Sequence, residues 1–587
     1  MWVLPTLYPD HPLPLPAFYG EWVAALLGLC AISLLVAKRC WVQLKIPYIF
    51  LLPVALSLLV LLQFAIGRVV YFEQCLLFIL YMVWAALLIV LARHLREELG
   101  LPAVTTVLSV CLLVGAELSA LIGILQHYPG HTSLDAFVMQ TDSPIVVANM
   151  AQPNNLANYL TLGLASLGLL FTRWKMRLWQ VMMLASPLLF VLVLTSSRSP
   201  WLYLPCLAGM AFLWQRRDKS CTPLLHFSLL MLLSFGLMHF VVQIPWLMGP
   251  YGNLSAIQRL LVTASQGIRL PIWHEAWLMF AQHPGLGAGF GQFPWQYFQL
   301  SSIVRDATLS NLNTYVEHAH NLVMHLAAEM GLAGLLILFG TLGLWLVQAY
   351  RAPRTIYHWW GCGVLAVLGI HSMLEYPLWY AYFLGIAAIT LGVFDYSTWR
   401  WPSRRWPSGW SIGIAGSGLM VAVLLAGGVV LFKMLPEYNK LANLFAARPQ
   451  EDKPDPIILR QIREDLMKMQ AQAPLLRSNV ESQLGEAGWN HTADKGALND
   501  RVMRSIPSYS SVHRGGLLLA RAGRQAEARA QIERAIWTYP AEFPALQKQL
   551  EDLARLDRDP SRFPALLSFG LQKYEEWKIE THYEVKE

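Results

Sequence analysis

The sequence predicts an all-α polytopic membrane protein with about twelve transmembrane helices and a C-terminal helical domain outside the membrane. Of its 587 residues, 55% are hydrophobic and only 14% are charged, a composition that excludes an ordinary soluble chain. Apolar windows of roughly 20 residues, the length that crosses a hydrocarbon core of about 30 Å, follow one another along most of the chain. Lysine and arginine gather in every second loop, as they do in multi-pass proteins.

Each apolar window is long enough to form one membrane-spanning helix. The windows are 18–37, 47–66, 74–92, 102–125, 155–172, 178–195, 200–215, 224–244, 320–348, 359–376, 377–396 and 411–434. Since 178–195 and 200–215 nearly touch, they form either two spans or a re-entrant pair. The predicted divisions are helices 1 to 8 in 1–244, a large outer loop in 245–319, helices 9 to 12 in 320–435 and an outer helical tail in 436–587.

The basic residues predict the orientation, because short loops rich in lysine and arginine stay in the cytoplasm. They follow the odd-numbered windows as Lys38, Arg39, Lys45, Arg93, Arg96, Arg173, Lys175, Arg177, Arg216, Arg217, Lys219, Arg351, Arg354, Arg400, Arg404 and Arg405. The first seventeen residues contain neither lysine nor arginine. We therefore place the N-terminus and the tail on the outer side, and we expect no cleavable signal peptide.

Charge and cysteine content exclude several functions. The net charge of +7 comes largely from the cytoplasmic loops, so it indicates topology rather than binding to nucleic acid. All seven cysteines lie in or beside the apolar windows. We therefore expect neither a disulfide framework nor a metal site built from thiolates.

Arginines on the outer side need a reason, because topology disfavours them there. Residues 126–154 and 245–319 contain no lysine, and the outer arginines considered are Arg198, Arg259, Arg269 and Arg305. A guanidinium group suits phosphate through its permanent charge and planar donors. We favour this role for Arg198 and Arg269. For Arg259 and Arg305 we favour a helix C-terminus or a lipid phosphate as the partner. The same alternative stays open for Arg198 and Arg269.

The stretch EHAHNLVMHLAAEMGLAG at 317–334 places ionisable groups at the start of an apolar window, where they are costly and suggest a function. On helical spacing, His318, Asn321, His325 and Glu329 form one polar stripe, either structural or functional, with His320 on another face. Two histidines in His-Ala-His on a helix point apart, and no HExxH motif is present, which disfavours a metal site. We expect His320 to act as a general base.

These residues carry a resemblance to a known family. His320-Asn321, nine residues, Gly331, two residues and Gly334 form the H-N-x9-G-x-x-G pattern of the O-antigen ligase and polymerase superfamily, named Wzy_C. The stretches AQPNNLANYL at 151–160, RLPIWHEAWLMFAQHPGLGAGFGQF at 269–293 and HSMLEYPLWYAYFLG at 371–385 resemble its PglL branch, the bacterial protein O-oligosaccharyltransferases. The resemblance covers roughly residues 15–440.

The resemblance implies block transfer of a preassembled oligosaccharide from undecaprenyl pyrophosphate to a Ser or Thr hydroxyl of a protein. The reaction would take place on the periplasmic face of the inner membrane, with membrane lipid, the lipid-linked donor and a periplasmic or pilin-like protein as partners. No cofactor is implied. His320 would remove the proton of the hydroxyl, and Arg269 and Arg198 would stabilise the departing pyrophosphate.

Further site residues follow from the matching motifs. Gln152 and Tyr376 would belong to the active site, although Gln152 could instead cap a helix and Tyr376 could be an ordinary interfacial aromatic residue. We assign substrate binding to Asn154, Asn321, His318, Trp273 and Glu375. Glu375 could orient a histidine or form an ion pair.

The glycines at 285, 287, 289 and 291 predict a tight loop over the lipid headgroup, because a nucleotide is not expected on the outer side. In the tail, LLLARAGRQAEARAQIERAIWTYP at 517–540 resembles half of a tetratricopeptide-like helical hairpin. The tail therefore either docks an acceptor or is a structural cap.

Two other functions stay open. An O-antigen ligase that transfers glycan to lipid A core would use the same His and Arg chemistry. A transporter or flippase would need ionisable groups at mid-membrane on several helices, whereas Glu117 is the clearest such group here. The QPN element and the helical tail favour the protein-directed enzyme.

Chelation by EDTA is expected to leave the implied transfer activity unchanged. No outer segment before the tail carries two close carboxylates, since Asp135 and Asp142 are well separated. Initial rates measured before and after EDTA treatment test this expectation. Loss of turnover that magnesium or manganese restores would show that a metal is required.

Overall fold

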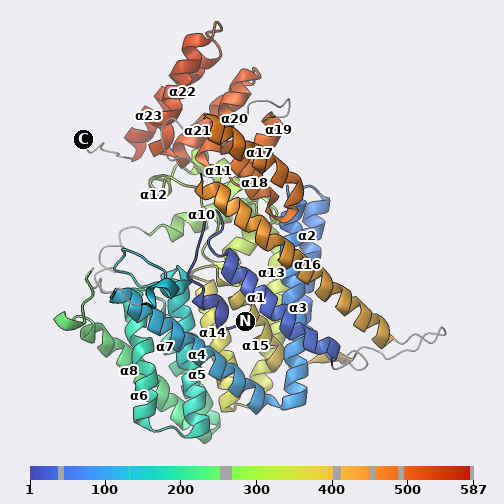
Figure 1. The fold of residues 1–587 in the computed structure, drawn as a ribbon, viewed down its shortest axis with the longest axis vertical. Coiled ribbons are helices and arrows are strands. Elements are labelled where there is room, and N and C mark those ends of the chain that lie inside the picture. Colours follow the sequence, from blue (N-terminus) through green and yellow to red (C-terminus); the bar gives the residue numbers. More distant parts are fainter. Residues whose placement is uncertain are drawn as a thin grey trace. The chain divides into compact units, whose positions relative to one another are not determined.

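The computed structural model describes residues 1–37, 45–130, 133–250, 267–400, 412–447, 456–486 and 495–581. Within these residues the chain is helical, apart from connecting loops, short 3-10 turns and one strand pair (Figure 1). The strands β1 (Lys45–Pro47) and β2 (Thr398–Arg400) pair antiparallel, with Lys45 opposite Arg400. The predicted all-α class is confirmed.

Every apolar window predicted from the sequence contains a helix. These helices are α1 (Phe18–Ala37), α2 (Leu51–Ala65), α3 (Phe72–Leu99), α4 (Leu101–His127), α5 (Pro153–Trp174), α6 (Leu178–Leu194), α7 (Pro200–Arg217), α8 (Thr222–Val241), α13 (Leu322–Arg351), α14 (Ile356–Ser372), α15 (Ala381–Phe394) and α16 (Ile412–Ala446). Among the described residues, eight helices are long and apolar enough to cross a membrane, while α6 and α15 are shorter apolar helices. A multi-pass membrane protein is confirmed, and the count of twelve spans stays a prediction.

The chain folds into two compact units, each assembled from segments that are distant in sequence. The first unit, called the membrane unit here, comprises Met1–Leu56, Leu80–Ser265 and Ile337–Lys433. The second, called the loop-and-tail unit, comprises Ser57–Ile79, Gln266–Leu336 and Met434–Glu587. The boundaries at 56, 79, 336 and 433 fall inside α2, α3, α13 and α16, so single helices contribute residues to both units.

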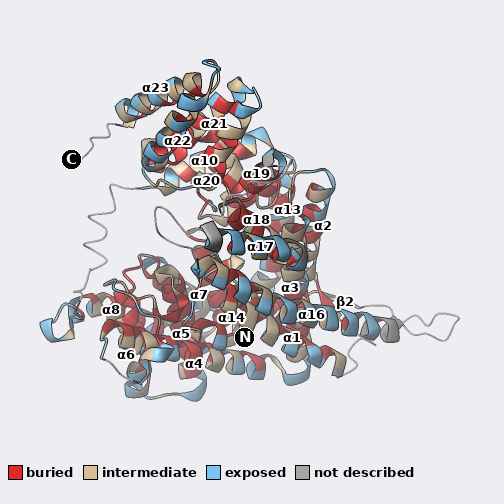
Figure 2. Cartoon of the chain, turned by 45° about the horizontal axis from the view of Figure 1, so that its top comes forward, coloured by how far each residue is buried: buried red, intermediate tan, exposed pale blue. Residues whose placement is uncertain are grey.

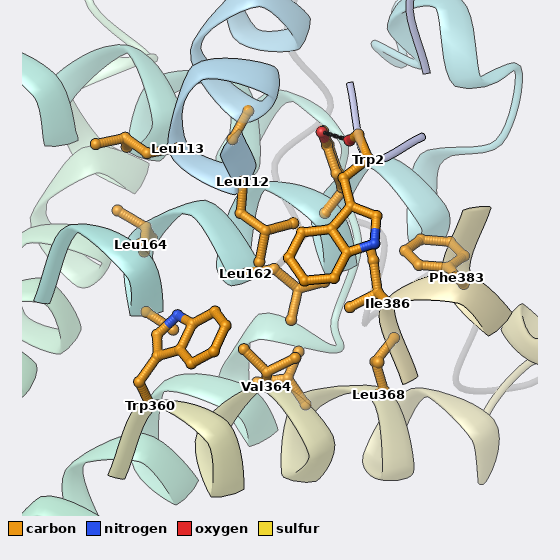
Figure 3. Packing of buried hydrophobic residues seen from close by; sticks show 14 of the residues in the cluster. Trp2, Leu112, Leu113, Leu162, Leu164, Trp360, Val364, Leu368, Phe383 and Ile386 are labelled. Carbon is orange, nitrogen blue, oxygen red and sulfur yellow. Dashed lines mark hydrogen bonds between the residues drawn. The ribbon is translucent and has the colours of Figure 1, made fainter. Parts of the chain in front are cut away.

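Helix α5 is the centre of the membrane unit. It is buried along almost its whole length and contacts α4, α6, α7, α8 and α14 (Figure 2). Small residues allow this close approach, since a Cβ added at Gly163 would lie 2.4 Å from the Ala116 Cβ. Figure 3 shows the surrounding apolar cluster, in which Trp2 and Trp360 pack with leucines of α4, α5 and α14. The Trp360 indole N–H donates to the Ser166 hydroxyl at 3.0 Å, so its polar atom is satisfied within the core.

In the loop-and-tail unit, three helices precede α13, namely α10 (Arg269–Gln282), α11 (Phe293–Val304) and α12 (Ala307–Ser310). The tail adds α17 (Pro456–Gln472), α18 (Arg477–Glu486), α19 (Lys495–Met503), α20 (Tyr509–Arg521), α21 (Gln525–Thr538), α22 (Phe543–Leu556) and α23 (Phe563–Thr581), coloured orange to red in Figure 1. The predicted stretch 517–540 folds as a helical hairpin of α20 and α21, which turns at Gly523 with a φ of 77°. A tetratricopeptide relationship of the tail stays a prediction.

Buried polar groups and ion pairs attach the tail to the segments that precede α13 and α3. The buried Glu481 carboxylate accepts hydrogen bonds from Tyr71 and Arg477, and Trp577 donates to Ser310. Arg305 caps the C-terminus of α11 by donating to the Ser302 carbonyl. The same guanidinium forms ion pairs with glutamates of α21 and α23 at 2.8 and 2.9 Å. The predicted helix-terminal role of Arg305 is confirmed, while Arg259 lies outside the described residues.

Candidate active site

The segment that contains His320 is a loop, so the predicted helical stripe is wrong for residues 317–321. Helix α13 begins only at Leu322, and His320 has a φ of 49° in the left-handed region. The physical reason is a helix cap: the Asn321 side chain accepts hydrogen bonds from the N–H groups of Val323 and Met324. Asn321 therefore starts α13, and its assignment to substrate binding stays a prediction.

The helical part of the predicted stripe is a bonded pair. His325 and Glu329 are buried at i and i+4 on α13, with His325 Nε2 at 3.3 Å from Glu329 Oε2. The other Glu329 oxygen accepts the N–H of Phe293 at 3.0 Å, and His325 Nδ1 accepts the N–H of Ala319 at 3.4 Å. Because Nδ1 accepts, Nε2 carries the imidazole proton and points at the carboxylate. This series of hydrogen bonds fixes Ala319, the residue immediately before His320.

Trp273 holds the same loop from the opposite side. Its indole N–H donates to the Ala319 carbonyl at 2.9 Å, so both backbone polar groups of the fully buried Ala319 are bonded. His318 lies edge-on to His325, with ring centroids 5.2 Å apart. Burial, together with the neighbouring His325 and His320, lowers the pKa of His318 well below its ordinary value. His318 is consequently neutral at pH 7. The His320 side chain is partly buried.

Arg269 lies one helical turn before Trp273. It is the first residue of α10 and is only partly buried, and the i, i+4 spacing puts it on the face of α10 that carries Trp273. Since Trp273 contacts the His320 loop, this face is the one that meets the loop. Arg269 and Trp273 therefore share one face of α10, and Trp273 bonds Ala319, the residue before the predicted base.

The glycine-rich segment 284–291 docks into a break in α13. Gly331 has φ 63° and ψ −159°, which interrupts the helix. The N–H groups of Leu332 and Ala333 donate to the carbonyls of residues 284 and 285, while the carbonyls of residues 328 and 329 accept N–H groups from residues 288 and 289. A Cβ at Gly287 would lie 2.2 Å from the Glu329 carbonyl oxygen. Glycine is needed at both 287 and 331 for this backbone contact.

Two side chains at the end of α2 stabilise the docked segment. Gln63 is fully buried and donates to the carbonyls of Leu286 and Glu329, and it accepts the N–H of Phe290. Arg68 donates to the Gly287 carbonyl. The sequence reading did not single out either residue, although Arg68 follows the second apolar window, where the predicted topology disfavours arginine.

A second group of predicted residues lies in the membrane unit, at the N-terminus of α5. The Gln152 side chain accepts the N–H of Asn155, so the alternative interpretation of Gln152 as a helix cap is correct. Asn154 donates to the buried Glu375 at 2.9 Å and accepts from the Ser197 hydroxyl at 2.7 Å. The structure thus joins the QPN element to the HSMLEYP motif and to Ser197, the residue before Arg198.

Arg198 projects from this group. The turn between α6 and α7 is buried at residues 195–197 and 199, but Arg198 itself is exposed. Among the described residues, no hydrogen bond or ion pair of its guanidinium is present. The Arg198 guanidinium is therefore available to bind a phosphate.

A buried polar chain beside α5 was missed by the sequence reading. His371 Nε2 lies 3.1 Å from Asn155 Oδ1, and His371 Nδ1 lies 2.9 Å from the Tyr203 hydroxyl. All three side chains are buried. Tyr376 follows a few residues later and stacks on Tyr380, with centroids 6.0 Å apart. His371 belongs to the HSMLEYP motif, which was the available signal.

The ten predicted site residues therefore form two groups, one in each unit. Gln152, Asn154, Arg198, Glu375 and Tyr376 belong to the membrane unit, and Arg269, Trp273, His318, His320 and Asn321 belong to the loop-and-tail unit. Within the part of the chain that the structure describes, no cluster of three or more His, Cys, Asp or Glu side chains could hold a metal ion.

Comparison with known protein families decides the classification. Residues 181–339 match the family described as O-Antigen ligase, and residues 359–552 match the family described as Virulence factor membrane-bound polymerase, C-terminal. Over these residues the chain is similar to the O-antigen ligase superfamily. Arg198, Arg269, His320 and the Gly331 break all lie within the O-antigen ligase match, and Tyr376 and most of the tail lie within the other.

Two curated proteins of Acinetobacter baylyi (strain ATCC 33305 / BD413 / ADP1) are similar to most of the chain. The chain is 28% identical over 451 residues to a General O-oligosaccharyltransferase, covering 73% of this chain and 74% of the relative. It is 23% identical over 373 residues to a ComP-specific O-oligosaccharyltransferase, covering 62% of this chain and 64% of that relative. The protein is a glycosyltransferase-type enzyme that is similar to PglL-type O-oligosaccharyltransferases.

Replacing Trp273 by phenylalanine is expected to lower kcat about five- to tenfold, because one buried hydrogen bond of about 1 kcal/mol holds the His320 loop. Donor and acceptor KM values should change little, since the ring is retained. Trp277→Phe, at an exposed position of the same helix, is the control and should behave like the wild type. Equal kcat in Trp273→Phe and Trp277→Phe would show that the indole N–H does not position the loop.

Proposed function

We propose that the enzyme transfers a preassembled oligosaccharide en bloc from undecaprenyl pyrophosphate to a Ser or Thr hydroxyl of a periplasmic or pilin-like protein. The similarity to two O-oligosaccharyltransferases supports the reaction class. The observation that carries the residue assignment is the His320 loop, in which a partly exposed imidazole follows a residue fixed by Trp273 and His325.

In the proposed reaction the acceptor oxygen attacks the anomeric carbon of the first sugar. The bond between that carbon and the pyrophosphate oxygen breaks, and its electron pair leaves with the pyrophosphate. His320 takes the proton of the hydroxyl as general base. Arg269 and Arg198 stabilise the negative charge that develops on the leaving group. No metal or cofactor is needed for these steps.

The remaining predicted residues would orient the donor. Gln152 uses its side-chain oxygen to cap α5, which leaves its amide N–H groups to donate to a sugar or phosphate oxygen. Asn154 is held by Ser197 and Glu375, so it would orient the segment around Gln152. Tyr376 would offer its hydroxyl to the donor. The neutral His318 would shield His320, the proposed base.

We place the enzyme in the bacterial inner membrane with its active site facing the periplasm. The alternation of basic loops supports this orientation. Part of that evidence, namely Lys38, Arg39, Arg404 and Arg405, lies outside the described residues. Labelling of single cysteines in the 317–321 loop with a membrane-impermeant reagent in intact spheroplasts tests the orientation.

Transfer of the glycan to lipid A core is the second candidate, and the O-antigen ligase match over residues 181–339 favours it. Purified enzyme reconstituted with lipid-linked oligosaccharide discriminates between the two acceptors. A mass increase of a candidate protein, measured intact, supports the proposed function. Modification of lipid A core alone would replace it.

His320→Ala is expected to reduce transfer by about 10²–10⁴-fold, since a general base contributes a factor of this size. His318→Ala should reduce it less. Because His320 has a φ of 49°, alanine also strains the backbone, so His320→Asn is the matched control: asparagine tolerates this conformation but provides no base. Near-normal turnover in either His320 variant, or equal losses at 318 and 320, would refute the assignment of the base.

Arg269→Lys is expected to reduce the initial transfer rate about tenfold, because lysine keeps the charge but loses the paired donors of the guanidinium. Arg269→Ala should reduce it by about 10²–10³-fold, the usual loss for a group that stabilises developing charge. Rates are measured against donor concentration, with Arg305→Lys as a control on the same outer segment. Wild-type rates in Arg269→Lys would remove this residue from the site.

A further inference from the structure

The tail contains a cavity of about 640 Å³ that the proposed reaction does not use. It lies within the loop-and-tail unit, between α11, α19, α20 and α21. Trp295, Met503 and Leu519 form an apolar part of its lining, whereas Gln299, Gln531 and Arg534 contribute polar groups. This volume and this mixture of an apolar wall with a few polar groups are typical of binding sites.

Arg534 is the unusual residue of the cavity. Its guanidinium is partly buried, its Nε is shielded from solvent, and no hydrogen bond or ion pair of this group is present among the described residues. The neighbouring Glu533 is already engaged by Arg305 at 2.8 Å and by Lys573 at 3.3 Å. Burial lowers the pKa of Arg534. A partly desolvated cation without a partner is costly, so this position calls for an anion.

The other charges of the lining are already neutralised by partners. Glu527 pairs with Arg524, and Asp500 pairs with Arg504 at 3.1 Å. Arg534 is therefore the lining cation that stays available in the described structure. Gln299 adds an amide that has no side-chain hydrogen bond among the described residues, and an amide of this kind can pair with a peptide backbone.

Side-chain packing connects the cavity wall to the segment before His320. Trp295 and Met503 belong to a small apolar cluster with Phe298, against which Tyr315 packs. The Tyr315 hydroxyl donates to the Glu317 carboxylate at 3.1 Å, three residues before His320. A molecule seated in the cavity would therefore contact Trp295 and Met503, which belong to the same apolar cluster as Tyr315.

We propose that this cavity binds an acidic segment of the acceptor protein, with a carboxylate of the segment on Arg534 and an apolar side chain against Trp295 and Met503. Arginine and tryptophan are the residue types that most often dominate the energetics of protein interfaces. The identity of the occupant as an acceptor rests on the proposed function, but its binding does not require turnover.

Direct binding to the full-length enzyme in detergent tests the proposal separately from transfer. The probe is a short fluorescent peptide of serine, leucine and glutamate, compared with an amidated peptide in which glutamine replaces every glutamate. Arg534→Gln should weaken binding of the acidic peptide about tenfold or more, as expected for a charge-assisted hydrogen bond. Arg529→Gln is the matched control, because Arg529 is an exposed cation on the same helix outside the cavity. It should bind the peptide like the wild type.

A second variant fills the cavity without changing charge. Ala530 lines the cavity one turn before Arg534, so Ala530→Phe should also weaken the acidic peptide. The glutamine peptide should bind wild type and Arg534→Gln equally weakly, which isolates the contact between carboxylate and guanidinium. Equal affinity of both peptides for the wild type, or unchanged affinity in Arg534→Gln, would overturn the proposal. Displacement of the peptide by inorganic pyrophosphate through Arg534 would assign the cavity to the donor and would also overturn it.

Failure of the proposed function gives a different result. If acidic peptides bind through Arg534 but no protein is ever glycosylated, the cavity is confirmed and the transfer reaction is wrong. If glycosylation occurs but peptide affinity is independent of Arg534, the reaction stands and the cavity proposal fails.

Discussion

The interruption of α13 at Gly331 is the constraint on which the proposed base depends. Breaking a helix in an apolar segment frees backbone groups that lipid cannot satisfy, so another part of the protein must bond them. The 284–289 segment does this through four backbone hydrogen bonds. It thereby ties α10 and α11 to α13, and α10 carries both Arg269 and the tryptophan that holds the His320 loop. The glycine-rich stretch and the H-N motif are one structural element, although 28 residues separate Gly291 from His320.

Most of the predicted site residues also have a structural task. Gln152 and Asn321 cap helices, Trp273 fixes a loop, and Asn154 bridges two motifs. Arg198 differs from these, because the fold surrounds it with buried residues while the described structure leaves its own side chain exposed. His320 is likewise held through its neighbour, Ala319. The residues proposed to act on the substrate are thus held in place by neighbouring residues whose own contacts maintain the fold.

The fold was largely predictable, whereas the detailed site was only partly so. Apolar length alone located every long helix before the tail, because spanning the membrane imposes it. Periodicity failed at 317–321, where the cap formed by Asn321 overrides the helical spacing of His318 and His325. Gln63, Arg68 and Ser197 were missed because their partners lie in other motifs, and their own surroundings in sequence look like ordinary span ends. Long-range contacts of this kind leave no local periodicity to detect.

The nine residues between Asn321 and Gly331 fix the distance along α13, and the rotation about its axis, between the helix cap and the helix break. They cover about two and a half turns of α13, so the cap and the break lie on defined sides of the helix, separated by roughly 15 Å along its axis. Inserting or deleting one residue would rotate the two ends by about 100° against each other. His325 and Glu329 could then no longer face Ala319 and Phe293 while the 284–289 segment stays docked. Helix geometry therefore explains why nine residues separate the H-N pair from the first glycine of the H-N-x9-G-x-x-G pattern in this chain.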